Sequence, residues 1–120
     1  MEQQYAGYWG RILRIDLSTG ESRVEQLDPL LYRRYMGGRN LALHYLLSEL
    51  PVGIDPLSPQ NMLIFMTSVL TGAPVAGQGR HTGAALSPLT GGLADSQCGG
   101  YWGAELKFAG YDGIIIQGRA

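Results

Sequence analysis

Met-Leu-Ile-Phe-Met-Thr, residues 62–67, is the stretch on which the predicted fold depends. The run is apolar almost throughout, whereas a strand with one face in water alternates apolar and polar residues, so the pattern is typical of a strand buried on both faces. Pro56 and Pro59 lie in the loop before it, and a Leu-Thr-Gly turn at residues 70–72 follows it. We therefore expect residues 62–67 to form the central strand of a sheet.

The rest of the chain predicts further strands and three helices around this strand. Leu13, Ile15 and Leu17 alternate with polar residues ahead of a Ser-Thr-Gly turn at residues 18–20, which predicts a hairpin with these side chains on its apolar face. The expected strands are the hairpin at 8–27 and the segments 62–67, 80–87 and 113–118, and the expected helices are 29–36, 39–49 and 100–109. This order predicts an α+β domain with a sheet-rich core and short helices.

Local signals mark the boundaries of the first two helices. Asp28 followed by Pro29 is typical of an N-cap and a first helical position. Gly37 and Gly38 then interrupt the helical pattern, and Arg39 begins the next helix. Two interpretations stay open for this interruption, since it suits a bend between helices as well as a contact with a ligand.

The last predicted helix, 100–109, has apolar residues at helical spacing. Trp102, Leu106 and Ala109 are expected on its buried face, and Gly110 suits the position after its C-terminus. In the second helix, His44 has no histidine or carboxylate one turn away, so we interpret it as a residue of the helix face rather than a metal ligand.

Composition restricts the class of protein. The chain has 120 residues, 45% of them hydrophobic, and a formal charge of −1, which fits one domain and gives no basic surface for nucleic acid or an anionic membrane. No apolar run is long enough to span a bilayer, and the first residues lack the pattern of a signal peptide, so we expect a cytoplasmic protein. Cys98 is the single cysteine, which excludes an internal disulfide and a four-thiolate iron–sulfur cluster bound by this chain alone.

Glycines gather in the second half of the chain around one arginine. Arg80 follows Gly77 and Gly79, and a glycine pair, Gly99-Gly100, precedes the last predicted helix. Glycine allows main-chain N–H groups to approach a ligand closely, and a guanidinium adds positive charge, so this pattern is typical of an anion or phosphate site. The alternative is that the glycines form ordinary turns and that Arg80 is a solvated strand residue.

Several motifs together resemble the N-terminal domain of the aldehyde ferredoxin oxidoreductases. They are Trp-Gly-Arg at 9–11 with the Ser-Thr-Gly hairpin, Pro-Leu-Ser-Pro-Gln-Asn at 56–61, Leu-Thr-Gly at 70–72, Gly-Arg at 79–80, Ser-Pro-Leu-Thr-Gly at 87–91 and Gly-Gly-Tyr-Trp-Gly-Ala-Glu-Leu-Lys-Phe-Ala-Gly-Tyr-Asp at 99–112. Members of this family hold tungsten, sometimes molybdenum, in a bis-pterin cofactor beside a [4Fe-4S] cluster, and they oxidise aldehydes to carboxylic acids with ferredoxin as electron acceptor. The resemblance thus implies a domain that binds a tungstopterin and a magnesium ion bridging its phosphates.

Carried over by position, the resemblance implies five cofactor-binding residues. Arg80 corresponds to an arginine that contacts the pterin phosphates, and its planar fork suits bidentate binding of phosphate oxygens. Gln97, Cys98, Gly99 and Gly100 stand where the family typically has Asn-Ser-Gly-Gly, and the main-chain carbonyl of Gln97 would bind magnesium. The sequence departs from the pattern at two positions, because the Gln97 side chain is longer than asparagine and Cys98 is a weaker hydrogen-bond donor than serine.

Two nearby residues have alternative interpretations. A thiolate at Cys98 could bind metal, but the family holds tungsten through dithiolenes, so we expect a small buried residue of the cofactor loop. His81 is expected to be a strand residue facing a neighbour or the cofactor rather than a catalytic base.

The resemblance also implies that residues 1–120 are a single, incomplete domain, inactive alone. The cluster ligands, the substrate pocket and the catalytic acid or base would lie in further domains or a partner subunit. The alternatives are a non-catalytic assembly module that docks through the exposed side of its last strand, and a generic phosphate-binding domain. Because residues 114–116 are three isoleucines in a last strand expected to lack a neighbour, we also expect the isolated chain to be marginally stable or to self-associate.

Overall fold

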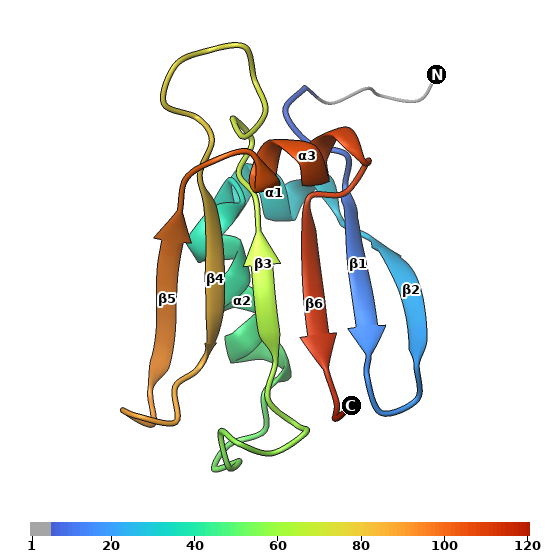
Figure 1. The fold of residues 1–120 in the computed structure, drawn as a ribbon, viewed down its shortest axis with the longest axis vertical. Helices are drawn as coiled ribbons and strands as arrows, with labels where there is room; N and C mark the ends of the chain where they lie inside the picture. The colour runs from blue at the N-terminus through green and yellow to red at the C-terminus, as the bar shows by residue number, and fades with distance from the viewer. Residues whose placement is uncertain (1–5) are drawn as a thin grey trace.

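The computed structural model describes residues 6–120 as one sheet with three helices (Figure 1). The elements are β1 (Arg11–Asp16), β2 (Glu21–Gln26), α1 (Pro29–Tyr35), α2 (Gly38–Glu49), β3 (Leu63–Met66), β4 (His81–Leu86), β5 (Leu93–Cys98), α3 (Trp102–Phe108) and β6 (Gly113–Gln117). The strand order is β2-β1-β6-β3-β4-β5, and every neighbouring pair is antiparallel except β1 and β6. The predicted α+β class is confirmed.

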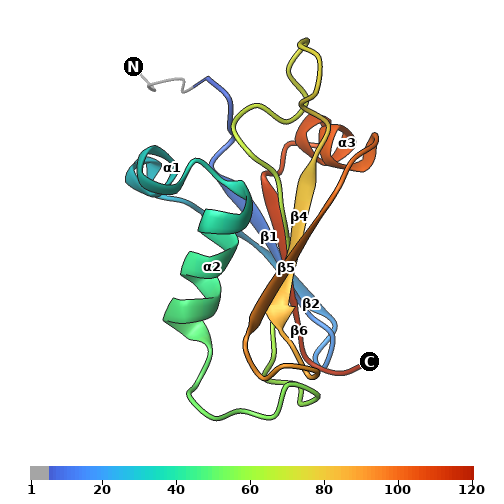
Figure 2. The same ribbon diagram turned by 90° about the vertical axis from the view of Figure 1, so that its left-hand side faces the viewer.

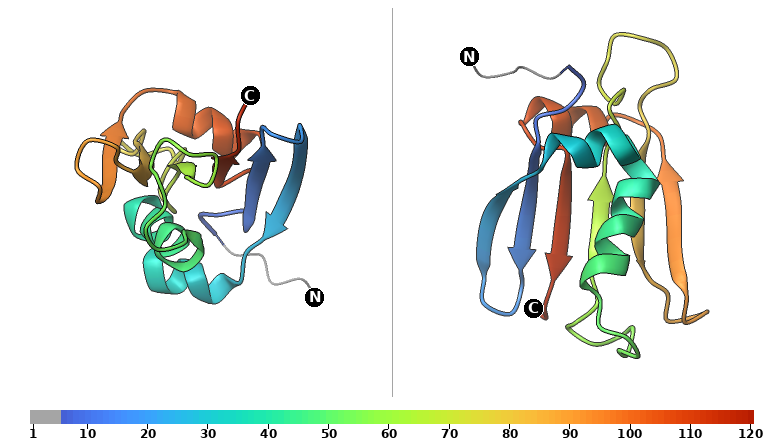
Figure 3. Two further views of the ribbon diagram at one scale, coloured as in Figure 1. Left: turned by 90° about the horizontal axis from the view of Figure 1, so that it is seen from below. Right: turned by 180° about the vertical axis from the view of Figure 1, so that it is seen from behind.

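Helices α1 and α2 cover one face of the sheet (Figure 2; Figure 3, right). The core lies between this helical layer and the strands, and it contains Ile12, Tyr32, Leu41, Ala42, Tyr45, Leu46, Met62, Ile64, Met66, Ala84 and Ile115. The opposite face carries no helix along its length, and α3 lies at one end of the sheet, beyond the strands β3 and β6. The fold is therefore one helical layer on one sheet.

The turn between α1 and α2 fixes the helical layer against β3. The side chain of Asp28 accepts a 2.9 Å hydrogen bond from the N–H of Leu30, so Asp28 caps α1 as the sequence predicts. Gly37 has φ +83°, and a Cβ there would lie 2.5 Å from the carbonyl oxygen of Thr67. A side chain cannot occupy that space, and this close approach favours the bend as the role of the glycine pair.

Two expectations about burial are wrong. Strand β3 is covered on one face only, because Ile64 is buried under α2 whereas Leu63 is 42% exposed on the other face. In β1 the buried side chains are Ile12 and Arg14, and the predicted apolar face with Leu13 is the uncovered one. Arg14 is tolerated under the helices because both of its terminal nitrogens donate to the carboxylate of Glu49, at 2.9 and 2.5 Å.

The last strand is not an edge, which corrects the expectation of a lost neighbour. β6 pairs with β1 on one side and with β3 on the other, so its N–H and C=O groups are engaged on both sides. The edges are β2 and β5. Docking or self-association through an exposed edge of residues 114–116 therefore has no structural basis.

Helix α3 buries a different face from the one predicted. Its buried residues are Gly103 and Lys107, whereas Trp102 and Ala109 are exposed. The Lys107 ammonium donates to the carbonyl oxygen of Gly7 and lies 3.5 Å from the carboxylate of Asp112, which is fully buried. A buried ion pair, which hydrophobic spacing does not reveal, thus decides the orientation of this helix.

Candidate functional site

Three segments meet at the end of the sheet where β5 ends and β4 begins (Figure 1). They are the loop that precedes β4, the end of β5 with the glycines after it, and the start of α3. The guanidinium of Arg80 reaches across this junction, and its Nη1 donates a long hydrogen bond of 3.5 Å to the side-chain oxygen of Gln97. Two of the residues predicted from the sequence, 17 positions apart, are thus brought into contact.

The β4–β5 hairpin produces this contact. Thr82 pairs with Gln97 and His81 with Cys98, so the ladder brings Arg80 and Gly99 to the same end of the sheet. Strand β5 was not predicted, and it lies at the edge of the sheet with every residue exposed. As an edge strand, it has main-chain groups on the side away from β4 that the sheet leaves unpaired.

Glycine is required where the two loops touch. A Cβ on Gly79 would lie 2.8 Å from the carbonyl oxygen of Gly100, closer than real Cβ atoms approach. Gly100 itself has φ +112°, a conformation that side chains rarely adopt, and no atom lies within 4 Å of a Cβ placed there or on Gly99. The main chain of these two residues is therefore open to a ligand beside Arg80.

Two residues not singled out from the sequence hold the loop that leads to Arg80. The hydroxyl of Thr71 donates a 3.0 Å hydrogen bond to the carbonyl oxygen of Arg80, and the side-chain oxygen of Gln78 accepts a 2.6 Å hydrogen bond from the N–H of Gly72. The Leu-Thr-Gly motif was a signal for Thr71, whereas nothing in the local pattern indicated Gln78. These contacts restrain the position of the Arg80 main chain.

Cys98 and His81 occupy different environments. Cys98 is exposed, which corrects the expectation of a small buried residue, and its thiol donates to the carbonyl oxygen of Gly99 at 3.3 Å. His81 is the expected strand residue, and its ring lies 4.5 Å from that of Trp102. Burial lowers the pKa of His81, which favours the neutral imidazole. Within residues 6–120, no cluster of three or more histidine, cysteine or acidic side chains could hold a metal ion.

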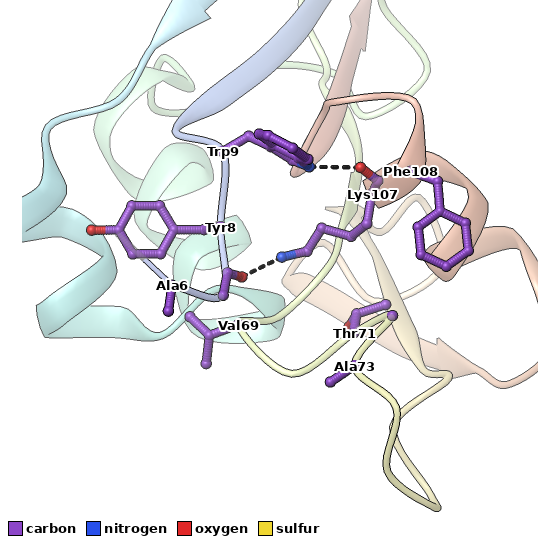
Figure 4. A pocket seen from close by; sticks show the side chains of 10 residues that line it. Ala6, Tyr8, Trp9, Val69, Thr71, Ala73, Lys107 and Phe108 are labelled. Atoms are coloured by element: carbon purple, nitrogen blue, oxygen red, sulfur yellow. Dashed lines mark hydrogen bonds between the residues drawn. The ribbon is translucent and has the colours of Figure 1, made fainter. Parts of the chain in front are cut away.

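A hollow of about 670 Å³ lies at the same end of the sheet, but its lining contains none of the five predicted residues (Figure 4). Trp9, Val69, Lys107 and Phe108 are among its lining residues. The indole of Trp9 donates a 2.6 Å hydrogen bond to the carbonyl oxygen of Lys107, which joins the start of β1 to α3. Because the Lys107 ammonium is engaged with main chain and carboxylate, we assign these polar contacts to the fold.

Comparison with known proteins decides the family. Residues 12–120 match the family described as aldehyde ferredoxin oxidoreductase, N-terminal domain. The chain belongs to this family. A tungsten-containing aldehyde ferredoxin oxidoreductase of Pyrococcus furiosus is 47% identical over 114 residues, which are 95% of this chain and 19% of that protein. An aliphatic sulfonate oxidoreductase, WOR-like subunit, of the same organism is 36% identical over 117 residues, with coverages of 94% and 18%.

A solved structure shows that the fold is shared within a longer chain. The active-site complex of benzoyl coenzyme A reductase, bound to 1,5-dienoyl-CoA, contains a chain that superposes with a TM-score of 0.95 at 36% identity. The match covers 98% of the present chain and 18% of that one. This aldehyde ferredoxin oxidoreductase domain thus spans about a fifth of the length of the relatives that it matches. Within residues 6–120, no helix is both long and apolar enough to cross a membrane.

Proposed function

We propose that the chain is the pterin-cofactor-binding domain of a tungsten- or molybdenum-dependent aldehyde ferredoxin oxidoreductase, which acts in the cytoplasm. The observation that carries the proposal is the contact between Arg80 and Gln97 beside the exposed main chain of Gly99 and Gly100, in a chain of this family. The family supports a tungsten cofactor, because relatives in it are named as tungsten-containing enzymes.

The donor chemistry at this junction fits an anionic cofactor. Arg80 is exposed, and its hydrogen bond to Gln97 engages one of the five N–H donors of a guanidinium. The remaining donors form a planar fork that binds two phosphate oxygens at once. Gly99 and Gly100 leave room for a phosphate to approach the main chain, where a side chain would block it. We propose that Arg80, Gly99 and Gly100 hold the pterin phosphates.

Gln97 and Cys98 complete the proposed set. The main-chain carbonyl of Gln97 would provide one oxygen ligand to a magnesium ion between the phosphates, a role that does not depend on the longer side chain. The side chain of Gln97 positions Arg80 through the 3.5 Å hydrogen bond. Cys98 is exposed at the end of β5, so its thiol can contact the cofactor edge as a weak donor, and we assign it no metal.

The chemistry of aldehyde oxidation belongs to the bound metal centre, which supplies the redox step when the cofactor is present. The residues of this domain bind and orient the cofactor, and none of them is proposed as a catalytic acid or base. The [4Fe-4S] cluster, the aldehyde site and the contact with ferredoxin are proposed to lie in the polypeptide outside this domain, which is the larger part of the relatives.

The experiment is cofactor retention by arginine variants of the full-length oxidoreductase. Arg80→Ala removes a charge-assisted contact of about 1.5 to 3 kcal/mol, equivalent to roughly a 10- to 150-fold loss of affinity. Arg80→Lys should restore part of it, because an ammonium keeps the charge but not the fork. Arg33→Ala is the matched control, since Arg33 is also exposed but lies on α1.

The readouts are pterin and tungsten content per chain and the melting temperature of the cofactor-free protein. We expect Arg80→Ala to lose cofactor and keep the apo melting temperature. Unchanged metal content together with a large fall in apo stability would instead assign Arg80 to the scaffold.

A further inference from the structure

The sheet face opposite α1 and α2 is apolar over its central strands. Its apolar side chains, called here the outer apolar face, are Leu13, Ile15, Leu63, Phe65, Ile114 and Ile116. Leu63 is 42% exposed and the other five are partly exposed, and Arg11 lies on the same face at the start of β1. The strand register makes the apolar side chains contiguous, since Ile114 lies between Leu13 and Phe65 and Ile116 lies between Ile15 and Leu63. Figure 1 looks onto this face, and Figure 2 shows that no helix lies along it.

Apart from Phe65, whose ring packs against His81 and Trp102, no helix of the chain covers these positions. Each strand has its other face in the core, where Ile12, Ile64 and Ile115 are buried. A sheet with one face in water carries polar side chains on that face, whereas strands apolar on both faces belong to sheets that are covered on both. A contiguous apolar surface in the middle of a sheet is typical of an interaction site. The apolar residues on both faces of β3 and β6 thus indicate that a second layer packs on the sheet, on the side opposite α1 and α2.

We propose that the outer apolar face is the surface on which the polypeptide adjoining this domain in the longer oxidoreductases packs. The P. furiosus relative at 47% identity has this domain as 19% of its length, and the solved neighbour has it as 18% of a longer chain within an active-site complex. This domain is one part of a longer chain in those proteins, so the apolar surface of the rest of the chain is available to cover the outer apolar face. Contact through a sheet edge is not available at β3 or β6, because both are paired on each side.

The location of this face gives the contact a consequence for the candidate site. His81 and Trp102 pack against Phe65 at the end of the face, with ring centroids 6.3 and 5.5 Å away. His81 directly follows Arg80 in the chain and pairs with Cys98. A polypeptide packed on the outer apolar face would therefore extend to the Arg80–Gln97 junction and line one side of the candidate site. The contact does not depend on which cofactor binds there.

The test compares two exposed leucines on opposite sides of the molecule. Leu63→Glu places a charge on the outer apolar face, whereas Leu47→Glu, the control, places it on α2, where Leu47 is 74% exposed. Ile114→Glu is a second variant on the outer face. Each 120-residue chain is co-expressed with a tagged polypeptide comprising the P. furiosus relative without its matching segment, and the amount retained on the tag is measured. Circular dichroism melts of the isolated chains check that each variant folds.

We expect the unsubstituted chain and Leu47→Glu to be retained equally, and both outer-face variants to be retained at least tenfold less while melting within a few degrees of the control. Equal retention of Leu63→Glu and Leu47→Glu would overturn the proposal, as would failure of the unsubstituted chain to be retained. Size-exclusion chromatography of the isolated chain tests a second copy as the occupant. A dimer that Leu63→Glu dissociates and Leu47→Glu does not would assign the face to self-association instead. Because none of these variants alters Arg80, Gln97, Gly99 or Gly100, their loss of retention bears on the docking surface alone, and the Arg80→Ala measurement bears separately on the proposed function.

Discussion

The carboxylate of Asp112 is the group whose removal should damage the fold most. It is fully buried, and it accepts hydrogen bonds from the main-chain N–H groups of Trp9, Gly10 and Arg11 at 2.7 to 3.2 Å. Its Oδ1, which accepts from the N–H of Trp9, also lies 3.5 Å from the ammonium of Lys107. One side chain thus fixes the entry to β1 and the end of α3.

Asp112→Asn keeps the shape and removes the charge. The amide nitrogen would face N–H donors that need an acceptor, and the Lys107 ammonium would stay buried without its counter-charge. Breaking one side of a buried ion pair costs about 3 to 5 kcal/mol. For a chain of 120 residues, each kcal/mol lowers the melting temperature by roughly 4 °C. We expect the melting temperature of Asp112→Asn to fall by about 12 to 20 °C.

Lys107→Met is the informative comparison. It removes the cation and keeps most of the aliphatic stem, and Asp112 retains its main-chain donors. Burial lowers the pKa of Lys107, which shows that the fold disfavours the charged amine even beside Asp112. We therefore expect Lys107→Met to cost less than half as much as Asp112→Asn, and the double variant to cost less than the sum. Urea and thermal unfolding followed by circular dichroism measure all three. A loss in Lys107→Met equal to that in Asp112→Asn, or strict additivity, would refute this reasoning.

Three further predictions concern other parts of the fold. Burial raises the pKa of both Tyr32 and Tyr45 above the unfolded value of 10.0. The free energy of unfolding should therefore fall above pH 10 by about 1.4 kcal/mol per pH unit for each tyrosine. In urea titrations Tyr45→Phe should halve that slope, and an unchanged slope would contradict the prediction. Gly37→Ala should cost about 1 to 3 kcal/mol more than Gly91→Ala, because both have positive φ but only the Cβ at Gly37 meets a carbonyl oxygen, at 2.5 Å. Equal melting temperatures of the two variants would contradict this. Because Cys98 is exposed, it should react with a thiol reagent as fast in the folded chain as in urea. Bound cofactor should slow this reaction by covering the thiol. Labelling only after unfolding would disprove the exposed position.

Sequence patterns predicted most elements because their signals are local. The Asp28 cap, the Ser-Thr-Gly turn and the apolar run of β3 each indicate an element within a few residues, and all three are confirmed. Strand β5 was missed because Leu-Ala-Asp-Ser-Gln-Cys has no apolar face. It forms a strand by pairing with β4, and pairing is not visible in its own composition.

The candidate site was predictable only in part, because its residues are brought together by strand pairing and not by a local pattern. The contact of Arg80 with Gln97 depends on the register of β4 and β5, so periodicity could not predict it. The resemblance named both residues as cofactor-binding but did not predict their contact. The exposure of Cys98 follows from the edge position of β5. The ion pair of Lys107 with Asp112 was not predicted, because helical spacing of apolar residues carries no signal for it. The cofactor-binding roles of the site residues stay predictions.

A crystal structure of the full-length oxidoreductase with its cofactor bound tests the central claim most directly. The proposal predicts phosphate oxygens within hydrogen-bonding distance of the Arg80 guanidinium and of the Gly99–Gly100 main chain, and a magnesium ion bound by the carbonyl oxygen of Gln97. Cofactor density located elsewhere, with Arg80 in contact with solvent or protein alone, would contradict it.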